Sequence, residues 1–282
     1  MSIEVYGEEL LMARPLWFVQ LLKKMFPNVK FIAKLTRFPI LGKIFDFLLF
    51  KEDEIIYLPL DKIVEVNEEI EKQSDLVLPS KVLEHFINKS KYHWIMNFCI
   101  CRESMQCNDY PRSLGCLFLG KAVLGINPQL GRRVSKEEAL EHIKKCKEAG
   151  LVHMIGRNLL DKQWLGVKPG YKLLSICNCD PCCCLWRVSP VLAPQIGSKI
   201  QKMPGVIVQV TDACIGCGIC LDNVCFVDAI YLDNERAKIS EECRGCGRCV
   251  DICPQKAIKL TIANKDFIRK SIKKIERIID VL

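Results

Sequence analysis

Hydrophobic residues between positions 11 and 50 recur every three or four positions, which is the spacing of one apolar face of an α-helix. Proline fixes the backbone and removes a hydrogen-bond donor, so Pro27 and Pro39 interrupt this pattern. The stretch therefore predicts three short amphipathic helices. Their apolar positions are Leu16, Trp17, Phe18, Val19, Leu21, Leu22, Met25, Phe26, Phe31, Ile32, Leu35, Phe38, Ile44, Phe45, Leu48 and Leu49.

The next part of the chain combines strand and helix patterns. Apolar and polar residues alternate over residues 55–58 and 62–66, which predicts two strands. A helix with one apolar face is predicted from about Ser80. Residues 92–98 then predict a strand that delivers Cys99 to its end.

Start and stop residues define the elements of the second half. Ser135 and Glu138 have the spacing of a capping box at the start of a helix, and Gly150 marks its end. Residues 171–176 predict a strand that leads into a run of cysteines. A last helix, capped by Asn264, carries an apolar stripe that we expect to pack against the protein itself.

The composition is that of a globular protein. The chain has 282 residues, of which 50% are hydrophobic and 26% charged, enough for two domains and a buried core. No apolar run reaches the roughly 20 residues that a membrane-crossing helix needs. The first residues are acidic and lack the order of a signal peptide. We therefore expect a cytoplasmic protein whose eighteen cysteines are reduced or bound to metal.

The net charge of +8 is concentrated near the N-terminus. Seven basic residues between positions 11 and 50 stand against one acid, Asp46. Basic amphipathic helices bind membrane interfaces or partner proteins, so residues 11–50 are expected to contact a membrane peripherally or an acidic partner. The alternative is that their apolar faces only cover the next domain. The basic residues are Arg14, Lys23, Lys24, Lys30, Lys34, Arg37 and Lys43.

Two other classes of partner are not expected. The helix that begins after Ser135 has no basic face suited to a DNA groove, so no nucleic acid is predicted. Gly115, Gly120 and Lys121 nearly match a phosphate-binding loop, but Ala122 replaces the hydroxyl residue that would hold magnesium. Nucleotide binding is therefore rejected there.

Eight cysteines form two matched runs between residues 206 and 262. In each run, three cysteines are separated by two residues, and a fourth follows after three or four more. Such spacing wraps a loop around a cuboidal iron–sulfur cluster, while intervening glycines let backbone amides approach the sulfides. The first run is Cys214, Cys217, Cys220 and Cys225, and the second is Cys243, Cys246, Cys249 and Cys253.

These runs resemble a bacterial-type ferredoxin with two [4Fe-4S] clusters. In that family the fourth cysteine of each run binds the other cluster. Two departures affect the cluster held by Cys225: one extra residue precedes it, and Phe226 replaces the usual proline. The resemblance implies one cluster on Cys214, Cys217, Cys220 and Cys253, and another on Cys243, Cys246, Cys249 and Cys225.

Zinc ribbons and disulfides are the alternatives for these runs. Zinc sites use two pairs of ligands and have no need for a third cysteine in each run. The cluster interpretation is therefore favoured.

A second concentration of cysteines follows two of the predicted strands. Five cysteines within residues 177–184 cannot all enter one core, because adjacent side chains of an extended chain point opposite ways. Metal thiolates are the favoured interpretation, and neighbouring parallel strands would bring both groups to one sheet edge. We expect at least one further iron–sulfur cluster, with either two centres or one cysteine of residues 182–184 turned away. The candidate ligands are Cys99, Cys101, Cys107, Cys116, Cys177, Cys179, Cys182, Cys183 and Cys184.

The other candidate ligands are assigned to the core. Cys146 falls on the apolar face of the helix after Ser135. The four histidines show no ligand spacing and are expected to be structural; they are His85, His93, His142 and His153.

Three features of the middle region resemble a group of iron–sulfur proteins from strict anaerobes: the strand-end sequence Cys-x-Cys-Arg at residues 99–102, the segment Gly-Leu-Val-His at residues 150–153, and the cysteine-dense run. The resemblance covers roughly residues 55–200. It implies an anaerobic redox context without naming a substrate.

Four regions are predicted: a basic helical segment (1–51), a cysteine-rich domain (52–203), the dicluster domain (204–262) and a terminal helix (263–282). The fold class is α+β, with a mixed α/β middle domain and a ferredoxin-like (βαβ)₂-type domain. The expected function is electron relay through two [4Fe-4S] clusters to or from an additional metal centre, in exchange with redox partner proteins. The alternatives are an oxidoreductase whose middle-domain cluster binds substrate, and a redox or iron sensor.

Overall fold

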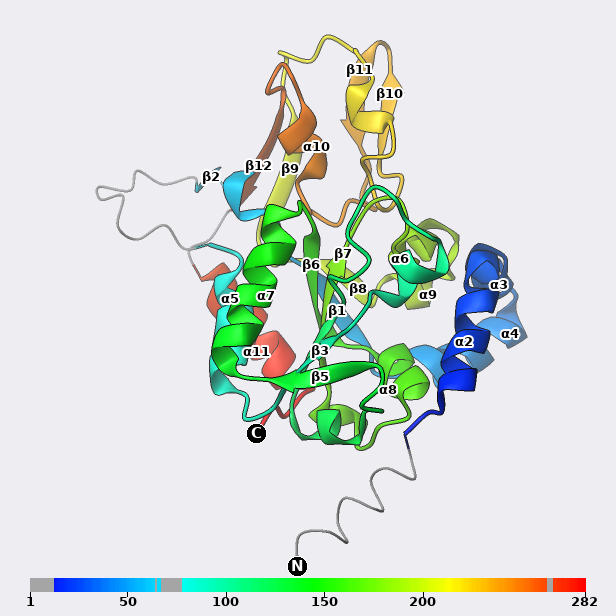
Figure 1. Cartoon of the computed structure of the whole chain (residues 1–282). Helices are drawn as coiled ribbons and strands as arrows, with labels where there is room; N and C mark the ends of the chain where they lie inside the picture. Colours follow the sequence, from blue (N-terminus) through cyan, green and yellow to red (C-terminus); the bar gives the residue numbers. More distant parts are fainter. Residues whose placement is uncertain (1–12, 64, 67–77, 263–265) are drawn as a thin grey trace, which may run out of the picture.

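A seven-stranded mixed sheet forms the centre of the molecule (Figure 1). The structure is a computed structural model that describes residues 13–63, 65–66, 78–262 and 266–282. Neighbouring strands are antiparallel except β1 and β8, which are parallel. In spatial order the strands are β5 (Gly131–Val134), β3 (His93–Met96), β4 (Leu117–Leu119), β7 (Leu174–Cys179), β6 (Val152–Arg157), β1 (Glu54–Tyr57) and β8 (Ile200–Lys202).

Both faces of this sheet are covered. Successive side chains of a strand point to opposite faces. In β1, Ile56 packs into one hydrophobic core, while Ile55 and Tyr57 pack into a second core. In β4, Leu117 packs into the first of these cores, and Phe118 packs into a third core on the other face. The strands therefore carry apolar residues on both sides, and the α+β fold class expected from the sequence is confirmed.

Three helices cover the first face of the sheet: α5 (Lys81–Lys89), α7 (Lys136–Glu148) and α11 (Phe267–Glu276). The predicted capping box is present at the start of α7, where Ser135 Oγ accepts from Glu138 N at 3.1 Å. Glu138 Oε2 accepts from Ser135 N at 2.8 Å in return. The predicted cap of the last helix, Asn264, lies outside the described residues.

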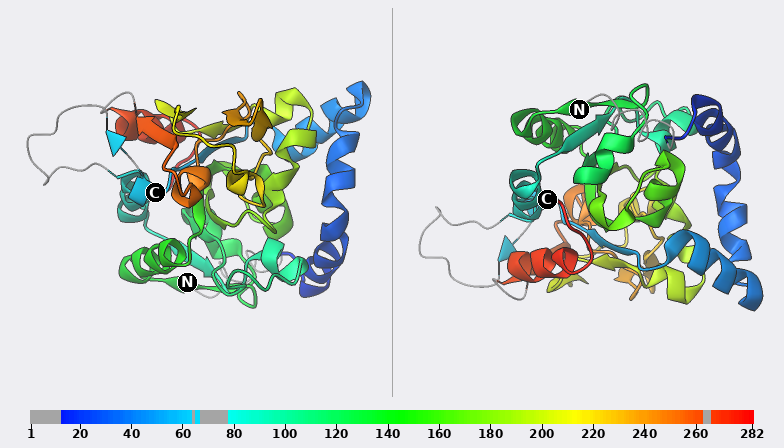
Figure 2. Two further views of the ribbon diagram at one scale, coloured as in Figure 1. Left: turned by 90° about the horizontal axis from the view of Figure 1, so that it is seen from above. Right: turned by 90° about the horizontal axis from the view of Figure 1, so that it is seen from below.

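The N-terminal helices form a wall on the opposite side of the molecule (Figures 1 and 2). As predicted, Pro27 and Pro39 separate three helices: Pro27 lies in a 3₁₀ turn and Pro39 begins the third helix. A π-helical turn follows the third helix and packs against α8 (Leu159–Leu165). The wall consists of α2 (Leu16–Met25), η1 (Phe26–Asn28), α3 (Val29–Leu35), α4 (Pro39–Phe45) and η2 (Asp46–Phe50).

A smaller unit with two short sheets sits at the end of the central sheet (Figure 1). Its first sheet has the order β2-β12-β9, and its second is the hairpin β10-β11. Two short helical turns carry cysteines between these strands. The elements are β2 (Glu65–Val66), β9 (Val206–Val210), η8 (Ile219–Leu221), β10 (Ile230–Asp233), β11 (Arg236–Ile239), α10 (Arg248–Ile252) and β12 (Ile258–Ile262).

Short helical elements complete the described chain. Most connect strands or hold cysteine-bearing loops. They are η3 (Asp61–Ile63), α6 (Ile100–Ser104), η5 (Lys121–Gly125), η6 (Gly170–Lys172), η7 (Leu185–Val191) and α9 (Pro194–Gly197).

Two predicted strands differ from the observed ones. The strand expected over 62–66 is reduced to β2, because a 3₁₀ turn occupies Asp61–Ile63. The strand expected over 171–176 begins only at Leu174. Residues before it form a turn, in which Lys172 N donates to Pro169 O at 3.1 Å. Among the described residues, no helix combines the length and hydrophobicity needed to cross a bilayer.

Candidate iron–sulfur sites

Three strands deliver cysteines to one edge of the central sheet. Cys99 follows β3 at the start of α6, Cys116 directly precedes β4, and Cys177 and Cys179 are in the last half of β7. Because β3 and β7 are both antiparallel to β4, they are parallel to each other and end at the same edge. The two strands had been expected to be neighbours, but β4 lies between them.

Six of the nine predicted middle-region ligands line one large cavity behind the N-terminal wall. The cavity has a volume of about 540 Å³ and is bounded by apolar side chains of α2, α3 and η2, together with residues of α8. The Sγ atoms of Cys116 and Cys177 are 3.9 Å apart, and Cys184 interacts with Cys179. We call these residues the six-cysteine group: Cys99, Cys101, Cys116, Cys177, Cys179 and Cys184.

Thiols of this group form hydrogen bonds to one another. The hydrogen bond between Cys116 and Cys177, reinforced by burial, raises the pKa of Cys116, and the same bond lowers the pKa of Cys177. Cys99 and Cys101 form a similar pair, in which their mutual hydrogen bond lowers the pKa of Cys99. Densely packed buried thiols of this kind suit soft iron ligation, because bound iron would stabilise all of them as thiolates. The donor set therefore fits an iron–sulfur centre.

The other three middle-region cysteines form a separate group with Asp180, a residue that the cysteine spacing did not single out. Cys107 Sγ lies 3.4 Å from Cys182 Sγ, which lies 3.0 Å from Cys183 Sγ. Cys182 Sγ also lies 3.1 Å from Asp180 Oδ1. All four donor atoms are within 4.8 Å of one another. Of the adjacent cysteines 182–184, only Cys184 turns toward the six-cysteine cavity.

Arg102 lies between the two cysteine groups and forms hydrogen bonds to the loops that carry them. Its fully buried guanidinium donates to Asp180 Oδ2 at 3.0 Å and to the carbonyl oxygen of Asn178 at 2.8 Å. It also donates to the carbonyl oxygens of Pro111 and Leu114. A cation with so many acceptors is positioned by the loops that carry the cysteines and offsets part of their negative charge.

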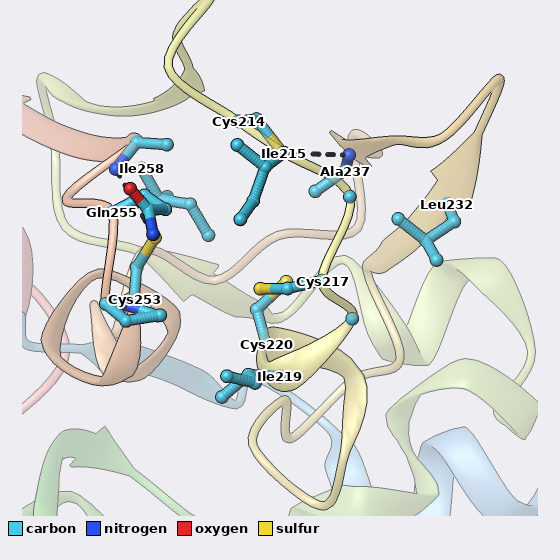
Figure 3. Close-up of a pocket in the computed structure, with 14 residues that line it drawn as sticks. Cys214, Ile215, Cys217, Ile219, Cys220, Leu232, Ala237, Cys253, Gln255 and Ile258 are labelled. Carbon is cyan, nitrogen blue, oxygen red and sulfur yellow. Dashed lines mark hydrogen bonds between the residues drawn. The ribbon is translucent and has the colours of Figure 1, made fainter.

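The first ferredoxin-type set surrounds a pocket at the outer end of the smaller unit (Figure 3). Cys253 faces three cysteines of the other run across this pocket. The backbone amide of Ala237 donates to Cys214 Sγ at 3.4 Å, as expected for a cradle around sulfur. Gly216 has a φ of +69°, and an added Cβ would lie 2.1 Å from a carbonyl oxygen, so glycine is required. The set is Cys214, Cys217, Cys220 and Cys253.

The second ferredoxin-type set lies deeper, toward the central sheet. Burial and then the neighbouring thiols of Cys225 and Cys243 raise the pKa of Cys246 to about 12. Burial and the same group of thiols, including Cys246, raise the pKa of Cys249. Backbone amides donate to Cys225 Sγ at 3.3 Å and to Cys243 Sγ at 3.4 Å. The structure thus brings Cys225 together with the run it does not belong to.

The two departures from the ferredoxin pattern have a structural explanation. Asn223, in the lengthened segment before Cys225, adopts a left-handed backbone conformation with φ 53°, which asparagine tolerates well. Phe226, in place of proline, is buried and packs edge-on against Tyr57 with ring centroids 5.6 Å apart. The smaller unit is therefore attached to β1 next to this cysteine set.

Cys146 and the histidines lie in structural roles. Cys146 is fully buried on α7, and its Sγ is 3.7 Å from His142 Nε2. His142 and His93 each have a ring nitrogen within hydrogen-bonding distance of a backbone carbonyl oxygen, at 2.9 and 2.7 Å. His153 Nδ1 is 2.8 Å from Asn178 Oδ1, and His85 pairs with Glu276.

The near match to a phosphate-binding loop has another cause. Gly115 lies where the chain passes closely over β3, and an added Cβ would be 2.5 Å from Phe98 O and 2.7 Å from Met96 Cβ. The carbonyl oxygen of Gly115 also accepts from Asn178 Nδ2 at 2.8 Å. The glycine is explained by packing beside the cysteines.

The comparisons with known proteins point to the same chemistry. The LdpA Fe-S cluster-binding domain family matches residues 222–263, which include Cys225, Cys243, Cys246, Cys249 and Cys253. Neither a curated protein nor a solved structure matches the chain. The family match and the cysteine groups support an iron–sulfur protein with a redox function.

Proposed function

We propose that the protein transfers electrons through two [4Fe-4S] clusters held by the ferredoxin-type sets and one further iron–sulfur centre held by the six-cysteine group. The first set is nearest to solvent, with Cys217 exposed, and would exchange electrons with a redox partner protein. The second set is in electrostatic contact with the first through Cys220 and Cys249. The electron path would then continue into the central sheet.

The observation that carries this proposal is the position of Tyr57. Its side chain is fully buried, and its hydroxyl has no hydrogen-bond partner among the described residues. Burial, and then the thiols of Cys184, Cys179 and Cys246, raise its pKa, and Tyr57 shares one core with these cysteines of the six-cysteine group and the second set. One buried aromatic side chain therefore lies in the core to which both groups contribute.

The backbone supports the same connection. Leu60, three residues after Tyr57, donates its amide to Cys246 O at 3.1 Å. Arg248 donates to Gly150 O and to Tyr110 Oη, both at 2.9 Å. These contacts favour a fixed distance between the two groups, which stable electron transfer requires.

Metal analysis of the full chain tests the proposal. Protein purified and reconstituted without oxygen should contain more than eight irons, and Cys177→Ser with Cys179→Ser should remove only the excess. Electron paramagnetic resonance of the reduced protein should show magnetic coupling that this double variant simplifies. Cys146→Ser is the control and should change neither result. Eight irons and freely alkylated middle-region thiols would rule the proposal out.

An oxidoreductase is the second candidate, and the cavity beside the six-cysteine group favours it. A volume of about 540 Å³ lies in the range of small-molecule sites, and its walls are mostly apolar. An iron without a thiolate ligand would bind added cyanide and change the resonance spectrum of the centre. A spectrum unaffected by cyanide would favour electron transfer alone.

A further inference from the structure

Cys107, Cys182 and Cys183 stand apart from the cavity that collects the other middle-region cysteines. None of these three side chains lines it. Their sulfurs are spaced by 3.4 and 3.0 Å, and Asp180 Oδ1 is 3.1 Å from the central sulfur. Cys107 is buried, while Cys182 and Cys183 are partly exposed, so the group lies near the surface.

Four donor atoms within 4.8 Å of one another are close enough to share a single ion. A tetrahedral ion with metal–sulfur bonds of about 2.3 Å holds its ligands about 3.8 Å apart. A cuboidal cluster places each thiolate on a different iron and spreads the sulfurs further.

We propose that Cys107, Cys182, Cys183 and Asp180 Oδ1 bind one divalent zinc ion. Three thiolates and one carboxylate give four ligands of the types zinc prefers. Backbone amides of Cys182 and Cys183 hold Asp180 Oδ1 at 3.0 and 2.6 Å, and its other oxygen pairs with Arg102.

Two further arginines support the loops that carry the zinc ligands. Arg112 donates to Cys107 O at 2.7 Å, and Arg187 donates to Pro181 O. Together with Arg102, they offset the charge that four anionic ligands leave on a divalent ion. The zinc site shares no cysteine with the six-cysteine group, although Asp180 also lines the cavity of that group.

Zinc analysis of the full-length protein tests the site. One zinc per chain is expected beside the iron, and Cys182→Ser with Cys183→Ser should abolish it with iron unchanged. Cys146→Ser should retain it. Cobalt substitution of the unaltered chain should give the intense visible absorption of a tetrahedral thiolate site, even if the double variant fails to fold. Absence of zinc, loss of iron in the double variant, or a Cys107–Cys182 disulfide in protein kept anaerobic would overturn the proposal.

The N-terminal wall carries a second, independent inference. Of the twenty large apolar side chains that are exposed in the described part of the chain, eleven lie between residues 16 and 48. Ile40 is 77% exposed, and Trp17 and Phe31 are each 67% exposed. Exposed apolar surface on this scale marks a binding site. The eleven are Leu16, Trp17, Leu21, Met25, Phe31, Phe38, Ile40, Leu41, Ile44, Phe47 and Leu48.

The charge of the wall indicates what covers it. Lys24, Lys30, Lys34 and Lys43 are exposed among these apolar residues, and the single acid, Asp46, pairs with Lys199. The helices form one side of the molecule (Figure 2). We infer that the wall binds the surface of an anionic membrane, with its apolar side chains below the headgroups and its lysines among the phosphates.

The cavity behind the wall is continuous with this surface. Met25 and Leu48 both line the cavity and are exposed, so it opens among the side chains that would enter the membrane. The inner side of the wall covers the six-cysteine group, and the outer side remains free. The inner side thus covers the six-cysteine group, as the alternative for residues 11–50 expected, and the outer side is the one that we infer binds the membrane.

Sedimentation with lipid vesicles tests the inference on the full-length protein. Vesicles that contain phosphatidylglycerol should bind the protein, and pure phosphatidylcholine vesicles should bind it less. Ile40→Ser with Phe47→Ser, or Lys30→Glu with Lys34→Glu, should each reduce binding roughly tenfold or more. The control is Tyr231→Ser with Lys238→Glu, on the exposed hairpin β10-β11, which should bind normally. No vesicle binding, or a solution dimer that the wall variants dissociate, would overturn it.

Discussion

In the proposed electron path, Tyr57 is the side chain between the second ferredoxin-type set and the six-cysteine group. Its hydroxyl is buried beside sulfurs and has no partner among the described residues, so it is free to donate to a sulfur of a bound cluster. We predict that Tyr57→Phe lowers the midpoint potential of the adjacent centre, because a hydrogen bond to cluster sulfur stabilises the reduced state. Redox titration followed by electron paramagnetic resonance measures the shift.

Stability separates this role from simple packing. In protein freed of its clusters, Tyr57→Phe keeps the ring against Phe226 and should not lower the free energy of unfolding, since an unpaired buried hydroxyl itself costs about 1–3 kcal/mol. Phe86→Leu, in the core on the other face of the sheet, is the control and should change stability without changing any potential. An unaltered potential in Tyr57→Phe would contradict the role, whether or not the iron content is as proposed.

Asp53 predicts a pH dependence of stability. Burial raises its pKa to about 7, although Leu159 N donates to its Oδ1 at 2.7 Å. Since the unfolded pKa is about 3.9, the folded protein binds more protons between about pH 4 and pH 7. The free energy of unfolding should therefore fall by up to about 4 kcal/mol as the pH rises through this window.

Substitution isolates this contribution. Asp53→Asn should reduce the dependence between pH 5 and pH 8 in anaerobic denaturant titrations, and the remainder should come from Asp161, whose pKa burial also raises to about 7. Glu241→Gln on the surface should leave the dependence unchanged. An equally steep dependence in Asp53→Asn would assign it to other groups.

Sequence reasoning at the residue scale identified cysteines more readily than their neighbours. Cysteine spacing is a local property, so the chain alone indicated which cysteines could bind metal and that residues 182–184 could not share one cluster. Tyr57 and Asp180 become relevant only through contacts between distant strands and loops. Asp180 did have a local signal, since it lies inside the cysteine run where a carboxylate could complete a metal site.

Gly115 allows the segment before Cys116 to pass close to β3. Its close approach to β3 leaves no room for a side chain, so Gly115→Ala should displace the segment that carries Cys116. We expect a loss of about 2–4 kcal/mol in unfolding free energy and a lower iron content, with the ferredoxin-type signals retained. Denaturant titration and iron analysis measure the two effects.

Gly125→Ala provides a matched comparison. An added Cβ there would meet Val167 at an ordinary 3.6 Å, so stability should stay within about 0.5 kcal/mol. Equal behaviour of the two variants would show that the close approach is not required.

Element prediction succeeded where periodicity was long and failed where elements were short. The helices that begin after Ser135 and around Pro27 and Pro39 were found because several turns repeat the apolar pattern. The strand β4 has only three residues, Leu117–Leu119, and lies in a segment whose glycines suggest a loop. Its omission made β3 and β7 seem to be neighbours.

One of the hydrophobic cores contains residues of both the larger and the smaller unit. Val206, Leu260 and Ile262 of the ferredoxin-like part pack with Met203 and residues of the central sheet. A fragment of residues 204–262 contains all eight predicted ferredoxin-type ligands but would expose these side chains. We predict that it binds about eight irons and loses them to a chelator faster than the full chain, because each side chain loses about 1.5–3 kcal/mol of burial. Absorbance of the iron–chelator complex gives both rates, and equal rates would contradict the prediction.

The arrangement of these units could not be predicted from the chain. The pairing of β1 with β8 joins residues about 145 positions apart, and the N-terminal wall packs against η7 and α8 rather than its sequence neighbours. Such contacts depend on complementary shapes and leave no local pattern. The grouping of the ferredoxin-type sets, by contrast, was implied by the family resemblance, because the crossing of the fourth cysteine is part of that family's pattern.

The N-terminal wall covers the six-cysteine group, which limits when iron and sulfide could reach these cysteines. Its sulfurs come from segments between Cys99 and Cys184, so no complete set of ligands exists until the central sheet has formed. The helices of the wall are synthesised first yet close over the cavity from outside. For the proposed centre, iron and sulfide would therefore reach these ligands only after the sheet assembles, either before the wall docks or through the opening beside Met25 and Leu48.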